Sequence, residues 1–202
     1  MFSIAATKDG QDIRCLSGGI QDMSYDPKAI ANEFILLAKR HGCELTPMKL
    51  QKLVYYTHGW HLAIKNSPLI NEQVEAWPFG PVIPSLYYAL RHFGKEPVTT
   101  LATTYTVHAT GPDEGDFEFE EHMPVIAVDS EQARFASSLT QRVWEVYGGY
   151  SAIQLSNMTH ESGSPWWQVY GQPRCKPPKG TDIPSDLIRE YFVKLSGRNP
   201  EN

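Results

Sequence analysis

The sequence predicts a mainly α-helical protein, a single compact domain of about six or seven helices with a small β-hairpin or extended insertion. Apolar residues recur at helical spacing over most of the chain, and capping residues followed by proline mark the start of several helices. Between about residues 95 and 128 the pattern changes, because β-branched residues become frequent and apolar residues alternate with acidic ones. These observations favour a helical domain around one insertion of β-structure.

Two helices are expected in the first third of the chain. The first extends from about Pro27 to His41, with Asp26 as the N-cap and a proline in the first turn. Thr46-Pro47 repeats this start signal, and apolar or aromatic residues follow at positions i, i+3, i+4 and i+7 as far as about Asn66. This second segment is expected to be the central helix.

The middle of the chain combines a turn, a helix and the insertion. Residues 74–82 contain too many prolines and glycines for a helix, so a short extended piece and a tight turn are expected there. A third helix is expected from Pro84 to Phe93, where Gly94 ends it. The insertion at 95–128 is predicted to form a β-hairpin or an ordered extended flap.

The C-terminal part is predicted to hold three helices and a turn. Capping residues and helix-ending glycines set the limits of the first two helices, and a Ser-Pro pair begins the turn. The helices are expected at about 130–148, at 151–159 and from Pro184 to Leu195, and the turn at Ser164-Pro165.

The domain organisation follows from where these patterns begin. A single helical domain is expected over residues 23–202, interrupted by the insertion at about 95–128. Residues 1–22 mix apolar and polar residues without a period and end in a Gly-Gly turn signal, so they are interpreted as an N-terminal extension. This extension is expected to be weakly structured or to become ordered on a partner.

Composition excludes several classes of protein. The formal net charge of -5 argues against a main task of neutralising nucleic-acid phosphates, so nucleic acid is not expected as a partner. Cys15, Cys43 and Cys175 form no CxxC pair, so neither a disulfide scaffold nor a four-ligand zinc site is expected. The sequence shows no signal-peptide pattern and no run of about 18 apolar residues, so a cytoplasmic protein without membrane contact is predicted.

Three histidines are the strongest candidates for enzyme chemistry. His58 and His61 lie three residues apart on a predicted helix, a spacing that metal ligands sometimes have, and His160 precedes Glu161 as in an acid/base pair. No HExxH, GxSxG or P-loop pattern accompanies them, so packing or hydrogen-bonding roles are favoured. No catalytic residue, metal ion or cofactor is predicted.

The aromatic and acidic residues are the candidates for binding. Most of the aromatic residues, among them five tryptophans, are expected to fill the core. A minority, above all in the turn from Trp77 to Phe79 and at Trp166 or Trp167, are expected to stay partly exposed and to anchor a partner. The acidic cluster from Asp113 to Glu121 is interpreted as a solvated loop face. Electrostatic steering of a basic partner is the alternative.

Three segments in order along the chain carry a resemblance to a known family. They are LTPMKLQKLVYYTHGWHLA from Leu45 to Ala63, VEAWPFGPVIPSLY from Val74 to Tyr87, and LSNMTHESGSPW from Leu155 to Trp166. Together they resemble the Panacea domain, also called SocA-like or formerly the phage-associated GepA family. The resemblance covers most of residues 28–170, and three linked motifs are more specific than any one of them.

The resemblance implies a mainly helical antitoxin of a toxin–antitoxin pair, which inhibits its toxin by direct protein contact. In such families the toxins are diverse and include translation inhibitors and alarmone synthetases. One relative is thought to deliver its toxin to a protease as an adaptor, and this is one alternative function. The other is a metal-dependent enzyme, which requires His58, His61 and His160 to converge in space.

By position, the family motif falls on Lys49, Lys52, Tyr55, Tyr56, Trp60, Trp77, Gly80, Pro81, Thr159, His160 and Trp166. Lys49 and Lys52 lie one helical turn apart and are expected to present a cationic patch, while Gly80-Pro81 fixes the turn beside Trp77. A structural role is predicted for Trp60, Gly80, Pro81, Thr159 and His160. Contact with a partner is predicted for Lys49, Lys52, Tyr56, Trp77, Phe79, Trp166 and Trp167.

Overall fold

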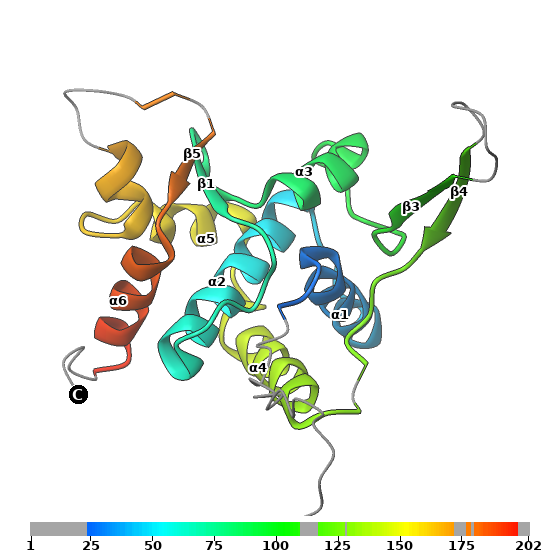
Figure 1. Ribbon diagram of the computed structural model, residues 1–202. Helices are drawn as coiled ribbons and strands as arrows, with labels where there is room; N and C mark the ends of the chain where they lie inside the picture. Colours follow the sequence, from blue (N-terminus) through cyan, green and yellow to red (C-terminus); the bar gives the residue numbers. More distant parts are fainter. Residues whose placement is uncertain (1–23, 110–116, 128, 172–176, 179, 198–202) are drawn as a thin grey trace, which may run out of the picture.

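A computed structural model describes residues 24–109, 117–127, 129–171, 177–178 and 180–197. These residues form a helical body from which a β-hairpin projects (Figure 1). The predicted fold class, mainly helical with a small β-element, is confirmed. The extension predicted at residues 1–22 lies outside the described residues.

The first two helices begin and end where the sequence predicts. Helix α1 (Pro27–His41) is capped by Asp26, whose carboxylate accepts a hydrogen bond from the Lys28 N–H at 2.8 Å, and Gly42 ends it in the left-handed conformation. Helix α2 (Pro47–Lys65) is capped by the Thr46 hydroxyl. Within the ranges described, every helix is too short or too polar to span a bilayer.

Helix α2 lies at the centre of the body. It packs against α1, α3 (Pro84–Leu90), α4 (Glu131–Tyr147), α5 (Ala152–Thr159) and α6 (Ser185–Leu195) (Figure 1). Neighbours on all sides explain why every residue from Leu50 to Gly59 is buried. The central position predicted for this helix is therefore observed, and polar side chains are buried with the apolar ones.

Three short strands form an antiparallel sheet in the order β2-β1-β5. Strands β1 (Val74–Trp77) and β2 (Gly80–Val82) are joined by a two-residue turn, with Trp77 opposite Gly80, as predicted for an extended piece and a tight turn. Strand β5 (Thr181–Ile183), which was not predicted, pairs with the other edge of β1. Three residues are too few to show the alternation of apolar and polar residues that marks a strand, and the partner strand β1 is about a hundred residues away in the sequence.

The remaining helical elements follow their local signals. A 3-10 turn, η1 (Arg91–Phe93), extends α3 as far as the predicted stop at Gly94. Ser151 and Gln154 form a capping box at the start of α5, and both of its hydrogen bonds are present. The turn predicted after Ser164-Pro165 contains a π-helical segment, η2 (Trp167–Gly171).

The insertion holds a second, two-stranded sheet, formed by β3 (Thr104–Ala109) and β4 (Phe117–His122). One buried side chain of α1 holds both of its ends. The Asn32 amide donates to the carbonyl oxygens of Ala102 and Pro124, both at 3.0 Å, and accepts from the Ala102 N–H at 2.8 Å. Asn32 therefore fixes the base of the hairpin on the helical body.

Gly59 lies where the buried Phe192 ring of α6 packs on α2, and a Cβ atom at this position would overlap with that ring. The ring cannot move aside easily, because it contacts Tyr55 and Trp60 edge-on. We expect Gly59→Ala to lower the free energy of unfolding by about 1–3 kcal/mol through overpacking, although alanine normally favours a helix. Urea unfolding measures the change.

Gly149→Ala is the matched control, because a Cβ atom there meets no atom within 4 Å. This variant should be as stable as the wild-type protein or slightly more stable. If both variants unfold at the wild-type urea concentration, α6 does not pack as tightly on α2 as the structure indicates.

Candidate partner-binding site

Pro78 and Phe79 form the turn between β1 and β2. Phe79 is 75% exposed, so its ring gains little from burial within the folded chain and is available to a partner. Gly80 follows with a φ of +102°, a backbone conformation that other residues rarely adopt. The turn therefore places a large apolar side chain on the surface.

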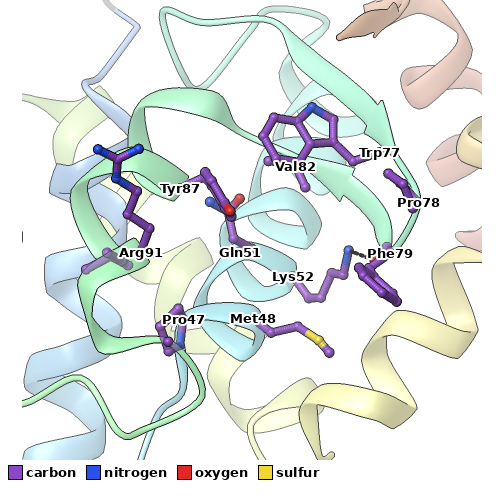
Figure 2. A pocket seen from close by; sticks show the side chains of 12 residues that line it. Pro47, Met48, Gln51, Lys52, Trp77, Pro78, Phe79, Val82, Tyr87 and Arg91 are labelled. Carbon is purple, nitrogen blue, oxygen red and sulfur yellow. Dashed lines mark hydrogen bonds between the residues drawn. The ribbon is translucent and has the colours of Figure 1, made fainter. Parts of the chain in front are cut away.

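Lys52 of α2 holds this turn from inside the protein (Figure 2). Its Nζ donates hydrogen bonds to the carbonyl oxygens of Phe79 at 2.8 Å and Pro81 at 3.1 Å. The residue is 1% exposed, and burial lowers the pKa of Lys52 to about 7, because water no longer stabilises the ammonium group. The amine acts as a buried donor that ties the turn to α2.

Helix α5 holds the same turn from a second direction. The Ser156 hydroxyl donates to the Phe79 carbonyl oxygen at 3.1 Å, so this oxygen accepts from both α2 and α5. The Thr159 hydroxyl donates to the Ser156 carbonyl oxygen at 2.7 Å. A Cβ atom on Gly80 would overlap with Lys52 Nζ and lie 2.7 Å from Thr159 Oγ1. Only glycine fits between these two side chains.

Trp166 supports the first half of the turn. Its Nε1 donates to the carbonyl oxygen of Trp77 at 2.7 Å, and His160 meets the indole edge-on, with ring centroids 3.9 Å apart. Burial, and then the charge of Lys52, lowers the pKa of His160. The His160 Nε2 is buried without a hydrogen-bond partner among the described residues. His160 therefore packs as a neutral ring behind Trp166.

An apolar pocket of about 230 Å³ opens beside Phe79. It is smaller than the pockets of about 300–1,000 Å³ that hold drug-sized ligands, and it suits an apolar side chain of a partner. The Trp77 and Tyr87 rings form part of its wall, with ring centroids 4.8 Å apart. Its lining comes from α2, the β1–β2 turn, α3 and η1, and includes Met48, Gln51, Trp77, Phe79, Val82, Tyr87 and Arg91 (Figure 2).

The residues predicted to contact a partner differ in their exposure. Phe79 lies on the surface, and Trp167 is half-buried. Trp77 lines the pocket, although little of its surface is free. Four of the predicted contact residues are at most 8% exposed and can offer a partner little area: Lys52, Tyr56, Trp77 and Trp166.

The cationic patch predicted for Lys49 and Lys52 is wrong. Lys52 is buried beneath the turn, and the Lys49 Nζ donates to the Gly148 carbonyl oxygen at 2.6 Å, at the end of α4. Both amines satisfy backbone oxygens of their own chain. The two lysines therefore connect α2 to two different elements.

The residues predicted to have a structural role all make contacts within the chain. Trp60 Nε1 donates to the Tyr147 hydroxyl of α4 at 3.2 Å. The other four residues surround the turn. They are Gly80, Pro81, Thr159 and His160.

Several site residues were not predicted. Met48 and Gln51 lie three residues apart on α2, which places them on one side of the helix, but their helical spacing equally suits a core position. Tyr87 and Arg91 come from α3 and η1, and no sequence signal indicates that these elements pack opposite α2. Met48, Gln51, Tyr87 and Ser156 all lie inside the three family segments, so the resemblance is the signal that could have included them.

His58 and His61 hold the loop after α2. The Leu69 N–H donates to His58 Nδ1 at 3.3 Å, and His61 Nδ1 donates to the Ser67 carbonyl oxygen at 2.8 Å. Burial, followed by the nearby His61, lowers the pKa of His58 to about 3. In the part of the chain that the structure describes, no group of three His, Cys, Asp or Glu side chains is placed to hold a metal ion. The convergence with His160 that a metal-dependent enzyme requires is not found.

Gly80→Ala should destabilise the protein, because it adds both the overlap with Lys52 and Thr159 and the cost of a positive φ. We expect a loss of about 2–5 kcal/mol in the free energy of unfolding, measured in urea. Gly163→Ala is the matched control, because Gly163 has a φ of +85° but no atom within 4 Å of an added Cβ. It should lose only about 1–2 kcal/mol. Equal losses would mean that the turn has room for a side chain.

The stability of the protein should rise with pH above neutrality because of Lys52. The pKa of this group is about 7 in the folded state and 10.5 when unfolded. Between these values the unfolded state binds more protons, so the free energy of unfolding rises with pH, by about 2 kcal/mol between pH 7 and pH 9 for this group. Lys52→Met should remove that part of the rise. If the free energy of unfolding changes by the same amount between pH 7 and pH 9 in both proteins, the pKa of Lys52 is not lowered in the folded state.

Comparison with known proteins identifies a family. The family described as Antitoxin SocA-like, Panacea domain, matches residues 50–167. A curated relative, Antitoxin SocA of Caulobacter vibrioides (strain NA1000 / CB15N), is 28% identical over 173 residues, which cover 84% of this chain and 83% of the relative. No solved structure matches the chain. The family match spans more than half of the chain and contains Lys52, the β1–β2 turn and Trp166, so this protein belongs to the SocA-like antitoxin family with a Panacea domain.

Proposed function

We propose that this protein acts in the cytoplasm as the antitoxin of a toxin–antitoxin pair and neutralises a cognate protein toxin by direct contact. The family supports an antitoxin role. One observation carries the proposal of direct contact. It is the β1–β2 turn, whose backbone is held by Lys52 and Ser156 while Phe79 stands exposed beside an apolar pocket.

Physical reasons make this turn the best-supported contact site. A turn that is already fixed by buried hydrogen bonds does not have to be ordered by the partner, which lowers the entropic cost of binding. Aromatic side chains beside well-packed pockets are the usual centres of binding energy in protein interfaces. In the proposed complex, Phe79 enters a hollow of the toxin, and an apolar toxin side chain enters the pocket between Met48 and Tyr87.

The edge of the pocket also offers a charged group. Arg91 lines the pocket, and its guanidinium lies 5.4 Å from the centroid of the Tyr88 ring. This stacking holds the side chain over an aromatic face and leaves its donors available for a carboxylate. A toxin segment that combines an apolar residue with an acidic neighbour would fit both features.

Expression of the adjacent reading frame, alone and together with this protein, tests the proposal. The neighbour alone should arrest growth, and this protein should restore growth and co-purify with it. Growth is a suitable readout because it responds whether the toxin is a translation inhibitor or an alarmone synthetase. An unchanged toxin level during rescue indicates masking, whereas a falling level that depends on a protease indicates an adaptor. A harmless neighbour that forms no complex would contradict the antitoxin proposal.

Phe79→Ala should weaken binding of the toxin by at least about tenfold without lowering the thermal unfolding temperature, because the ring contacts a partner and not the core. Isothermal titration calorimetry and a melting curve measure the two effects. Leu195→Ala is the control, since Leu195 is also an exposed apolar residue, 50% exposed at the end of α6. Equal affinities of both variants and the wild-type protein would exclude Phe79 from the contact.

A further inference from the structure

The β3–β4 hairpin has one apolar face. Val107 pairs with Phe119, and Tyr105 pairs with Glu121, so alternation along the strands places Tyr105, Val107, Phe117 and Phe119 on the same side of the ribbon. These four side chains are each more than half exposed. Glu121 lies at the base of this side, where its carboxylate accepts a hydrogen bond from the Tyr105 hydroxyl at 2.8 Å. An antiparallel ribbon normally turns its apolar face to the core. Here that face is left open in the isolated chain.

The opposite face of the hairpin is polar. Thr106, His108, Glu118 and Glu120 alternate with the apolar residues, and His108 Nε2 lies 3.3 Å from a carboxylate oxygen of Glu120. This face suits contact with water. This alternation of apolar and polar residues is typical of a sheet that buries one face and exposes the other to water.

The base of the hairpin is held by hydrogen bonds and borders a cavity. Asn32 binds the backbone at both ends, and the Thr104 hydroxyl donates to an Asp26 carboxylate oxygen at 2.9 Å. A cavity of about 440 Å³ lies between the apolar face and η1, and Tyr105, Phe93 and Met123 contribute to its lining. The cavity therefore meets the apolar face at Tyr105, and we call the two together the groove.

Charge indicates which partner fits this groove. Between Glu96 and Ala133 the sequence has nine Asp and Glu residues and no Lys or Arg, so all 18 Lys and Arg of the chain lie elsewhere. Glu118 and Glu120 are exposed on β4, on the face opposite the apolar one. A segment of this charge repels nucleic-acid phosphates, anionic lipids and a second copy of itself, and it attracts a basic protein surface.

We propose that the apolar face of the β3–β4 hairpin is a second contact surface for the toxin, and that it receives a basic region of the toxin that carries apolar anchor residues. This proposal rests on the proposed function and extends it from one contact to two. The Phe79 turn supplies one contact, and the hairpin supplies an acidic, aromatic arm that the toxin meets separately. The acidic residues steer the toxin toward the apolar face.

The test uses the full chain and the purified product of the adjacent reading frame, with association and dissociation rates measured by surface plasmon resonance. The double variant Phe117→Ser and Phe119→Ser removes both phenylalanine rings from the apolar face, and it should weaken binding at least tenfold. The variant Thr106→Ser and His108→Ser changes the same number of side chains on the opposite face and should bind like the wild-type protein. Circular dichroism and melting curves verify that both variants keep the helical body.

A second set of variants separates the effect of the acidic charge on binding from the effect of the apolar face. Glu118→Gln and Glu120→Gln leave the apolar face intact and should lower the association rate severalfold at low salt, with a weaker dependence on salt than the wild-type protein shows. The dissociation rate should change little.

Each contrary result has its own meaning. If the Phe117/Phe119 variant binds like the wild-type protein while Phe79→Ala binds weakly, the hairpin proposal is wrong and the proposed function stands. If the wild-type protein binds no product of the adjacent reading frame, both proposals fail. A wild-type dimer that the Phe117/Phe119 variant converts to a monomer would assign the apolar face to a second copy and overturn the proposal.

Discussion

The amine of Lys52 joins the central helix to the β1–β2 turn inside the protein. It donates to the carbonyl oxygens of Phe79 and Pro81. The Phe79 oxygen also accepts from Ser156, whereas the Pro81 oxygen is buried, and a buried oxygen without a donor would be costly. In return the two oxygens replace part of the hydration that the amine loses when it leaves water. Gly80 has no side chain that would overlap with this amine, and the Ser156 hydroxyl adds a second donor to the Phe79 oxygen. The exposed ring of Phe79 is placed by these buried contacts.

The helices could be predicted because their signals are local. Asp26, Ser151 and Gln154 mark helix starts by hydrogen bonds that form within a few residues, and the turn at residues 74–82 is encoded by its own prolines and glycines. An exposed aromatic side chain at that turn was expected from the aromatic residues that the turn carries, and the exposed residue is Phe79, while Trp77 is buried. Strand β5 could not be predicted, because its three residues become a strand only through pairing with β1.

The depth of the site residues could not be predicted for a different reason. Lysine is normally a surface residue, so nothing local indicates that Lys52 ends beneath the turn. Whether Trp77 and Trp166 are covered depends on the packing of α5 and of the segment after it, which the spacing of aromatic residues does not contain. The family resemblance selected residues that frame the turn. The residues that line the pocket, such as Met48 and Tyr87, follow from the tertiary arrangement.

Asn32 attaches the hairpin to the helical body through backbone atoms. Its amide bonds only to backbone atoms of Ala102 and Pro124, so it holds the two ends of the insertion whatever side chains the strands beyond Thr104 carry. Asn32 is therefore a socket for the arm, and the hydrogen bond from Thr104 to Asp26 is a second attachment beside it. Strands of another length or composition could be grafted onto that socket to retarget the protein, with the packing around α2 left as it is.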